Sequence, residues 1–246
     1  MEDDRLYRDP ALAQFYDVEN GWAPDLDYCR HLAEDVESIL DLGCGTGLFA
    51  ARMAEGRRVV GVDPAAAMLE IARSRPGGRA VEWLEADARS LRLEERFDLI
   101  VMTGHAFQVF LEERNQRAVL ATIAYHLAHH GRFIFDSRNP AAEEWHEWTP
   151  DRSCRQLEHP TLGPVEAWND AEFDPGSGIV TYWTHYRVTA SGDLLSAESH
   201  IRFTPQDTLA AFLSDAGLAV DSWLGDWQGN PYTPTSPDII PVGRLM

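Results

Sequence analysis

Short apolar runs alternate with amphipathic segments over residues 38–135 of this 246-residue chain. The runs are rich in Val, Ile, Leu and Phe, which is typical of strands buried on both faces. Between them, apolar residues recur every three or four positions, and two short helical patterns precede them within 10–34. Strands that alternate with helices favour a parallel sheet covered on both faces. The strands are predicted over 38–42, 59–63, 81–84, 97–102 and 132–135.

The pattern changes over residues 140–204, where alternating segments near 165–173, 179–188 and 194–203 are separated by turn sequences. This spacing predicts an antiparallel meander. Thr204-Pro205 then predicts a helix start with a capping hydroxyl and Pro at the first helical position, and Gly217 predicts its end. Two further strands are expected near 218–224 and 239–245. We therefore predict one α/β domain over 1–246 with a β-rich flap inserted over 140–204.

The charge balance excludes several kinds of chemistry. All 21 basic residues are Arg and face 40 Asp and Glu, so the formal net charge is −19. Without Lys, the chain cannot form a Schiff base, hold pyridoxal phosphate through a lysine or build a P-loop. A negative charge of this size also disfavours binding to a nucleic-acid backbone.

The cysteines and the termini bear on the compartment. Cys29, Cys44 and Cys154 are too few and too scattered for a disulfide framework or a zinc cage. No apolar run approaches the roughly 20 residues of a membrane span, and the acidic amino terminus lacks a signal-peptide core. We expect a cytoplasmic protein, monomeric or homodimeric, with no metal, membrane or nucleic-acid partner.

A glycine-rich loop follows the first predicted strand. Gly43, Gly45 and Gly47 give the spacing G-x-G-x-G after Asp41, and Asp63 ends the second strand. Glycines allow a tight turn and close approach to a ligand, and an acid at that second strand can accept both ribose hydroxyls of an adenosine. A dinucleotide loop reads G-x-G-x-x-G/A, but Leu48 stands at its last position. S-adenosylmethionine therefore fits better than a nicotinamide dinucleotide, because Asp41 could bind its ammonium. The alternative is a plain glycine turn in which Asp63 caps the next helix.

Four motifs in order resemble the class I S-adenosylmethionine-dependent methyltransferases of small molecules. They cover about residues 35–136, and they are Asp41-Leu42-Gly43-Cys44-Gly45-Thr46-Gly47, Gly61-Val62-Asp63-Pro64 with Met68-Leu69, Glu85-Ala86-Asp87-Ala88, and Phe97-Asp98-Leu99-Ile100. The resemblance implies a doubly wound seven-stranded sheet of order 3-2-1-4-5-7-6 with strand seven antiparallel. It also implies S-adenosylmethionine as the cofactor.

The resemblance also implies roles for individual residues. The glycines would line the methionine and ribose, Asp63 would hold the ribose hydroxyls, and Met68 would pack on the adenine. Tyr16 resembles an aromatic that covers the cofactor, although a packed helix residue is the alternative. Asp87 and the Ala88 amide would contact the adenine, and Thr103 would offer backbone to the methionine amino group. The full predicted cofactor set is Tyr16, Asp41, Gly43, Cys44, Gly45, Gly47, Asp63, Pro64, Met68, Asp87, Ala88 and Thr103.

The segment after the fourth strand, 102–108, is where this family usually contacts its acceptor. It contains neither Asn/Asp-Pro-Pro-aromatic nor Pro-Cys, so nucleobase and glutamine acceptors are disfavoured. We predict methyl transfer to N or O of a small molecule, with His105 as the candidate base; a histidine that bonds a backbone group is the alternative. The candidate acceptor contacts are Phe107, Asp136, Arg138 and Trp183.

Several features have competing interpretations. Arg138 and Asp136 could read a charged acceptor or form an ion pair at the entry to the flap. The flap aromatics could cover a cationic acceptor or simply pack on the sheet. His126, His129 and His130 are interpreted as the last turn of a helix, not as metal ligands. For the whole protein, the alternatives are a non-catalytic S-adenosylmethionine sensor or assembly module and a nicotinamide oxidoreductase.

Overall fold

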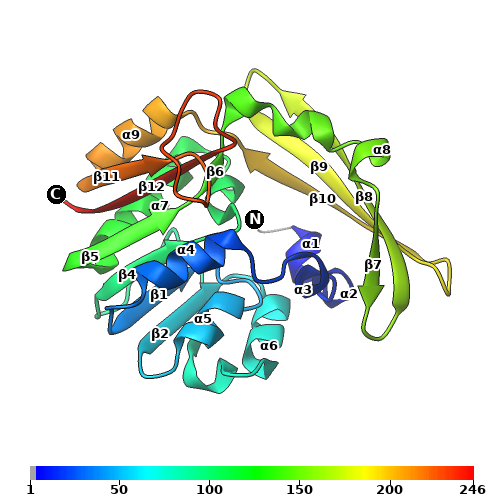
Figure 1. Ribbon diagram of the computed structural model, residues 1–246, viewed down its shortest axis with the longest axis horizontal. Coiled ribbons are helices and arrows are strands. Elements are labelled where there is room, and N and C mark those ends of the chain that lie inside the picture. Colours follow the sequence, from blue (N-terminus) through cyan, green and yellow to red (C-terminus); the bar gives the residue numbers. More distant parts are fainter. Residues whose placement is uncertain (1–3) are drawn as a thin grey trace.

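The central element of the fold is a mostly parallel sheet. The computed structural model describes residues 4–246, and Figure 1 shows the sheet beside a second, separate one. Its strands run in the order β11-β12-β5-β4-β1-β2-β3, and β12 is antiparallel to both β5 and β11. With β11 and β12 as the sixth and seventh strands, this is the predicted order, which is confirmed. The strands are β1 (Ser38–Leu42), β2 (Arg58–Asp63), β3 (Glu82–Glu85), β4 (Phe97–Met102), β5 (Leu127–Phe135), β11 (Leu218–Leu224) and β12 (Asp238–Leu245), and the short β6 (Ser137–Arg138) pairs with β12.

Helices cover both faces of this sheet because each strand sends alternate side chains to opposite faces. Ile39 lies in an apolar cluster with residues of α4 (Pro24–Leu32) and α5 (Leu48–Met53). Leu40, the next residue, lies in a second cluster with residues of α7 (Glu113–His126) and α9 (Gln206–Asp215). This doubly covered sheet leaves the carboxyl ends of its parallel strands free to build a site.

A second, antiparallel sheet forms the flap. Its order is β10-β9-β8-β7, with β7 (Arg155–His159), β8 (Gly163–Asp174), β9 (Ile179–Val188) and β10 (Leu194–Arg202). Three of these strands match the predicted meander, and β7 was not predicted. Short helical segments at Pro140–Ala142, Glu144–Glu147 and α8 (Pro150–Ser153) lead into it. That the whole chain forms one domain stays a prediction.

Three short helices at the amino terminus lie between the two sheets (Figure 1). They are α1 (Arg5–Arg8), α2 (Pro10–Ala13) and α3 (Tyr16–Glu19). Both α1 and α2 contact β10 of the flap and α6 (Ala66–Ser74) of the sheet layer, while α3 contacts β7. The amino-terminal segment therefore bridges the two sheets. None of the helices in the described part of the chain combines the length and apolar character that a membrane span requires.

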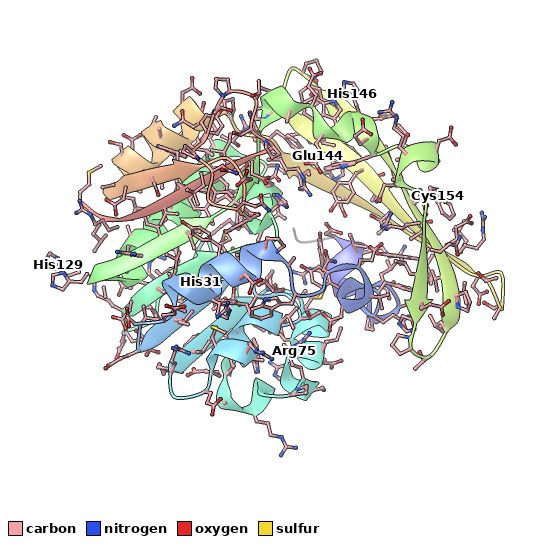
Figure 2. All side chains as sticks on the ribbon, in the orientation of Figure 1. His31, Arg75, His129, Glu144, His146 and Cys154 are labelled. Atoms are coloured by element: carbon pink, nitrogen blue, oxygen red, sulfur yellow. The ribbon has the colours of Figure 1, made fainter. Side chains whose placement is uncertain are left out.

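Two predicted boundaries are wrong. Helix α7 ends at His126, and β5 begins at Leu127, so His129 and His130 lie in a strand and not in a last helical turn. Figure 2 shows His129 at the outer end of this strand, away from the flap. The His126 ring accepts a hydrogen bond from the Leu93 amide and donates one to the Thr122 carbonyl, and burial lowers its pKa. Among residues 4–246, no group of three or more ligand-type side chains is arranged to hold a metal.

The start of α9 also differs from the prediction. The helix begins at Gln206 with Pro205 as its N-cap residue, and no side chain caps it. The Thr204 hydroxyl instead accepts a hydrogen bond of 2.9 Å from the buried Gln116 amide. A tertiary contact therefore takes the hydroxyl that local sequence assigned to the cap.

Candidate active site

A cavity of about 670 Å³ lies at the carboxyl ends of the parallel strands, between the sheet, the amino-terminal helices and the flap. Its wall includes the residues that follow β1 and β4, the two neighbouring strands on either side of the point where the strand order reverses. Ligands of open α/β sheets bind at this point. The volume lies within the usual range for small-molecule and cofactor sites.

The glycine loop contributes two of its three glycines to the cavity wall. Gly43 and Gly45 line the cavity, whereas Gly47 does not. Gly47 has φ +72°, and a Cβ there would lie 2.3 Å from the Trp83 ring. Gly47 is therefore needed for packing beneath the loop, and Gly45 leaves space on the cavity side, where its nearest neighbour is Tyr16.

Asp63 holds the loop and also faces the cavity. Its Oδ2 accepts from the Gly45 amide at 2.9 Å, and its Oδ1 accepts from the Ala65 amide at 2.8 Å. Each oxygen keeps capacity for a second donor, such as a ribose hydroxyl. Burial raises the pKa of this carboxyl, and the two amides oppose that rise. The cofactor and capping interpretations of Asp63 are thus compatible.

Eight of the twelve predicted cofactor residues line the cavity. Pro64, Met68 and Ala88 form an apolar part of the wall next to Asp63. Their arrangement fits a flat apolar ring beside a ribose. The eight are Tyr16, Gly43, Gly45, Asp63, Pro64, Met68, Ala88 and Thr103.

The other four lie outside the wall: Asp41, Cys44, Gly47 and Asp87. Asp41 is 3% exposed, and burial, with the nearby Asp63 charge, raises its pKa to about 7. Both Asp87 oxygens accept from the Arg89 guanidinium. Neither carboxyl lines the cavity, and their predicted cofactor contacts stay predictions.

Tyr16 lies in the cavity wall next to the glycine loop. Its ring is 3.8 Å from the position that a Cβ on Gly45 would take, and its hydroxyl is 3.6 Å from the corresponding position on Gly104. The side chain thus spans the loops that follow β1 and β4. This position is compatible with both interpretations, since Tyr16 lines the cavity and also packs against an apolar cluster.

His105 is held between carboxylates in a strained backbone conformation. Its φ of 59° is left-handed, which is costly for a residue other than glycine and persists only where surrounding contacts require it. Its amide donates to Asp136 Oδ1 at 2.9 Å, and its ring Nε2 lies 3.2 Å from Asp238 Oδ1 and 3.4 Å from Asp136 Oδ2. In the neutral tautomer that carries its proton on Nε2, the ring donates to these carboxyls and has its lone pair on Nδ1.

The wall around His105 is acidic. Asp25, Asp136 and Asp238 all line the cavity, and Asp136 is fully buried. Burial raises the pKa of Asp25 and of Asp136, and His105 opposes the rise at both. The Oδ1 atom of Asp25 is buried and has no hydrogen-bond partner among the described residues. A buried carboxylate oxygen without a donor is costly, so a bound cation would stabilise this wall.

Acidic side chains also outnumber basic ones over the whole cavity wall. Seven carboxylates face three guanidiniums; Arg138 pairs with Glu144 at 2.9 Å, and Arg155 pairs with Glu19. Arg138 also lies over the Trp148 ring. The ion-pair interpretation of Arg138 therefore holds. The carboxylates are Asp4, Glu19, Asp25, Asp63, Asp136, Asp226 and Asp238, and the guanidiniums are Arg8, Arg138 and Arg155.

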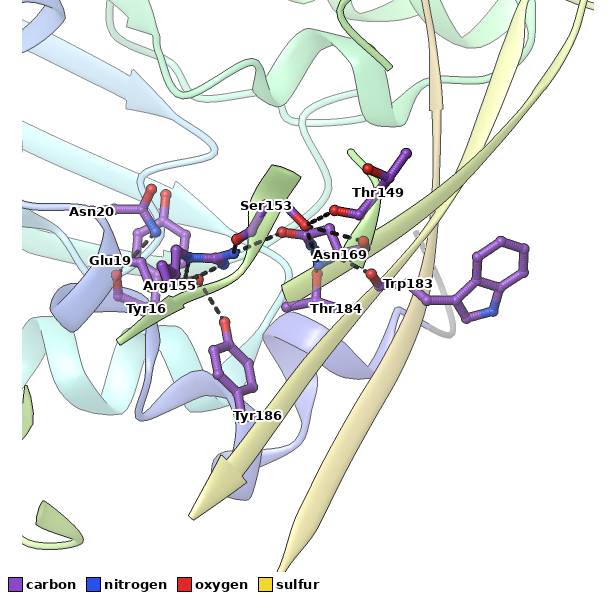
Figure 3. Close-up of polar contacts among 10 residues, drawn as sticks. All are labelled: Tyr16, Glu19, Asn20, Thr149, Ser153, Arg155, Asn169, Trp183, Thr184 and Tyr186. Atoms are coloured by element: carbon purple, nitrogen blue, oxygen red, sulfur yellow. Dashed lines mark hydrogen bonds and ion pairs between the residues drawn. The ribbon is translucent and has the colours of Figure 1, made fainter. Parts of the chain in front are cut away.

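Two predicted acceptor contacts do not reach the cavity. Phe107 is fully buried in the sheet core, where it stacks on Phe135, and Trp183 donates to Glu198 at 2.9 Å. Figure 3 shows the Trp183 ring directed away from the polar cluster around Arg155. Neither residue lines the wall, since Phe107 belongs to the core and Trp183 is partly exposed on the flap. Of the four candidates, the structure brings Asp136 and Arg138 to the cavity.

Sequence reasoning missed several residues of the wall. Asp25 and Asp238 are 213 positions apart, yet both lie near His105 because α4 and β12 begin at the same edge of the sheet. Tyr7 lies in the wall with its hydroxyl 3.3 Å from that of Tyr182. No local motif marks these residues. The one signal in the sequence that could have found Asp25 and Asp238 is their place at the start of a helix and a strand.

Comparisons with known proteins agree with this geometry. A methyltransferase domain family matches residues 39–131. The chain is 28% identical to the cypemycin N-terminal methyltransferase of a Streptomyces species, over 98% of each chain. Other curated relatives match 37–44% of this chain, and they include both N- and O-methyltransferases.

Solved structures share the fold over nearly the whole chain. The CcbJ methyltransferase of Streptomyces caelestis has a TM-score of 0.76 at 20% identity, covering 95% of this chain and 96% of that one. The amino pentose methyltransferase CalS10 of Micromonospora echinaspora, solved with S-adenosylmethionine bound, has a TM-score of 0.69 at 20% identity and covers 94% of each chain. The similarity to these structures extends to the flap as well as the sheet, because it covers nearly all of each chain.

Proposed function

We propose that the chain, which is similar to a methyltransferase domain family and to a methyltransferase over its full length, is a class I S-adenosylmethionine-dependent methyltransferase and that it methylates the nitrogen of a small-molecule amine. The observation that carries this proposal is the acidic wall around His105, where three carboxylates face the cavity next to Thr103. An ammonium is the acceptor that such a wall attracts most strongly, and a neutral hydroxyl gains little from it. The full-length relative, whose name specifies an N-terminal methyltransferase, supports the same choice.

The cofactor fits the part of the cavity nearest the glycine loop. We place the adenine against Pro64, Met68 and Ala88, the ribose at Asp63, and the methionine between Gly45 and Thr103. The support for this placement is the Cβ-free surface of Gly45 and the spare acceptor capacity of the two Asp63 oxygens. Tyr16 then covers the cofactor from the flap side.

The acceptor part of the cavity has two tasks. Asp25, Asp136 and Asp238 bind and orient the ammonium, and the Nδ1 lone pair of His105 takes a proton from it, leaving the nitrogen lone pair free to attack. S-adenosylmethionine supplies the methyl group, so a new N–C bond forms as the C–S bond breaks and S-adenosylhomocysteine leaves. Orientation by the wall is a large part of the catalysis, since alignment alone can contribute roughly 7–11 kcal/mol.

Incubation with radiolabelled S-adenosylmethionine and paired acceptors tests this function. Each pair consists of an amine and the alcohol of the same carbon skeleton, and small peptides with a free or an acetylated amino terminus form a second pair. We expect label in the amines only. Transfer to the alcohols would overturn the choice of nitrogen. Binding of the cofactor without transfer to any acceptor would support a sensor instead.

A further inference from the structure

Helix α3 is a single turn whose side chains reach three parts of the molecule. Asp17 points to the cofactor side, where its carboxylate accepts from the Thr46 hydroxyl and from Arg75 Nη2, each at 2.6 Å. Thr46 belongs to the glycine loop, and Arg75 Nε donates to the Thr46 carbonyl at 2.8 Å. This end of the turn is therefore tied to the loop that lines the cofactor site.

Glu19, at the other end of the turn, is tied to the flap (Figure 3). Its carboxylate accepts from Arg155 Nε at 2.6 Å and from the Tyr186 hydroxyl at 2.7 Å. Arg155 continues the network to Asn169, which bonds Thr184. Two flap strands, β7 and β9, thus contact the Glu19 carboxylate directly, and β8 is linked to it through Arg155. Charge-assisted hydrogen bonds of this kind are about twice as strong as neutral ones.

An aromatic stack reinforces the link to the flap. Phe15, the residue before the turn, stacks on Tyr186 with ring centroids 4.2 Å apart and an interplanar angle of 11°. Phe15 is fully buried, and Tyr186 is 2% exposed. A shift of β9 would therefore move the start of α3 with it, because close-packed side chains transmit displacement.

Tyr16 lies between these two ties. It is the residue of the turn that lies next to Gly45 and Gly104 in the cavity wall. We propose that α3 is a strap in which Glu19 and Arg155 act as positioning residues: they transmit the position of the flap to Tyr16 and so couple the acceptor side of the cavity to cofactor binding. This inference rests on the proposed cofactor placement, and it does not depend on the acceptor being an amine.

Calorimetric titration with S-adenosylhomocysteine tests the strap without any acceptor. We expect Arg155→Met to weaken binding roughly 5- to 20-fold, within the usual range for coupling between sites. Glu19→Gln keeps the shape of the side chain and should weaken binding in the same direction even if Arg155→Met folds poorly. The matched control is Arg187→Met. It removes an exposed pair between Arg187 on β9 and Glu166 on the neighbouring β8.

A second background shows whether the effect passes through Tyr16. In Tyr16→Ala protein, Arg155→Met should cause no further loss of affinity, and Glu19→Gln combined with Arg155→Met should equal the larger single effect. Affinity equal to that of Arg187→Met would overturn the proposal, as would a full Arg155→Met effect in the Tyr16→Ala background. Either result would leave the methyltransferase function untouched, since no transfer is measured.

Discussion

At the scale of single residues, His105 combines backbone strain with an unusual set of neighbours. Its ring contacts Asp136 and Asp238, while its own amide also bonds Asp136. A left-handed histidine held by one carboxylate at both its amide and its ring is fixed in orientation, which is what proton transfer to a single atom requires. A merely structural histidine would not need to face a cavity.

Replacing His105 with Asn separates its ring chemistry from its backbone. Asn tolerates left-handed φ, so the loop should keep its shape. We expect kcat/KM for the amine to fall about 10²- to 10⁴-fold, the usual contribution of a general base, with little change in affinity for S-adenosylhomocysteine. The control is His146→Asn, an exposed flap histidine labelled in Figure 2 whose ring lies 3.6 Å from Glu143 and beside the Trp145 ring. A change in rate no larger than in the control would remove His105 from catalysis.

The buried carboxyl of Asp41 lowers the stability of the folded chain when it is ionised. Burial raises its pKa to about 7 in the folded chain, whereas the exposed carboxyl of the unfolded chain titrates near 3.8. The folded state therefore holds the proton more tightly, and the free energy of unfolding falls as pH rises from about 4 to about 7. Above that window, the buried charge is a constant burden on stability.

Asp41→Asn should relieve that burden, because the amide is neutral and nearly the same shape. We expect the variant to be more stable than the wild type by about 2 kcal/mol at pH 8, and the gain to disappear near pH 4. Urea unfolding at the two pH values measures it, with the exposed Asp35→Asn as control. A pH-independent difference would show that folding does not raise the pKa of Asp41.

At the scale of elements, strand positions followed from the sequence more closely than strand ends did. The strands β1 and β4 were predicted with their observed bounds because both faces are buried and the apolar run is continuous. Strand β5 starts five residues early, through His129 and His130, whose exposed side chains carry no apolar signal. Strand β7 consists mostly of polar and charged residues, so its sequence shows no strand pattern. Only its pairing with β8 makes it a strand.

The glycine loop was predicted as a unit, but the reasons for its glycines differ. Gly47 needs both a left-handed backbone and the space that Trp83 fills. Gly192, in a flap turn, shares the left-handed backbone, with φ +77°, but has nothing within 4 Å of a Cβ. The two positions therefore separate backbone strain from packing.

Gly47→Ala should destabilise the fold by about 1–3 kcal/mol more than Gly192→Ala does. Both variants incur the left-handed penalty of an alanine, roughly 1–2 kcal/mol, and only Gly47→Ala also pushes a methyl group into the Trp83 ring. Denaturant unfolding of the two variants measures the difference. Equal destabilisation would mean that Trp83 moves aside without cost, and that Gly47 is needed only for its backbone.

At the scale of the whole molecule, the two halves of the cavity differ in how far the sequence could predict them. The cofactor half follows from one contiguous stretch, so Gly43, Gly45, Asp63 and Met68 were named in advance. The acceptor half is assembled from Asp25, Asp136 and Asp238, together with residues of the flap, and only the tertiary fold brings them together. Asp136 was named in advance from its place after the fifth strand, whereas no local pattern marks Asp25 or Asp238.

The net charge of −19 extends the acidity of the cavity to the whole molecule. A field of one sign raises the local concentration of an oppositely charged ligand and accelerates its association, and salt screens the effect beyond about 10 Å at 0.1 M. A cationic amine approaching this protein should gain from the field, whereas S-adenosylhomocysteine, which is neutral overall, should not.

Raising the salt concentration from 0.05 to 0.5 M should therefore lower kcat/KM for an amine acceptor several-fold, mainly through KM. Binding of S-adenosylhomocysteine should change much less over the same range, and this provides the internal control. In Asp238→Asn protein the amine should be a poorer acceptor at low salt, and its salt dependence should be smaller, because one charge of the wall is gone. An amine whose kcat/KM is unaffected by salt in both proteins would mean that the acidic wall does not recognise the acceptor by its charge.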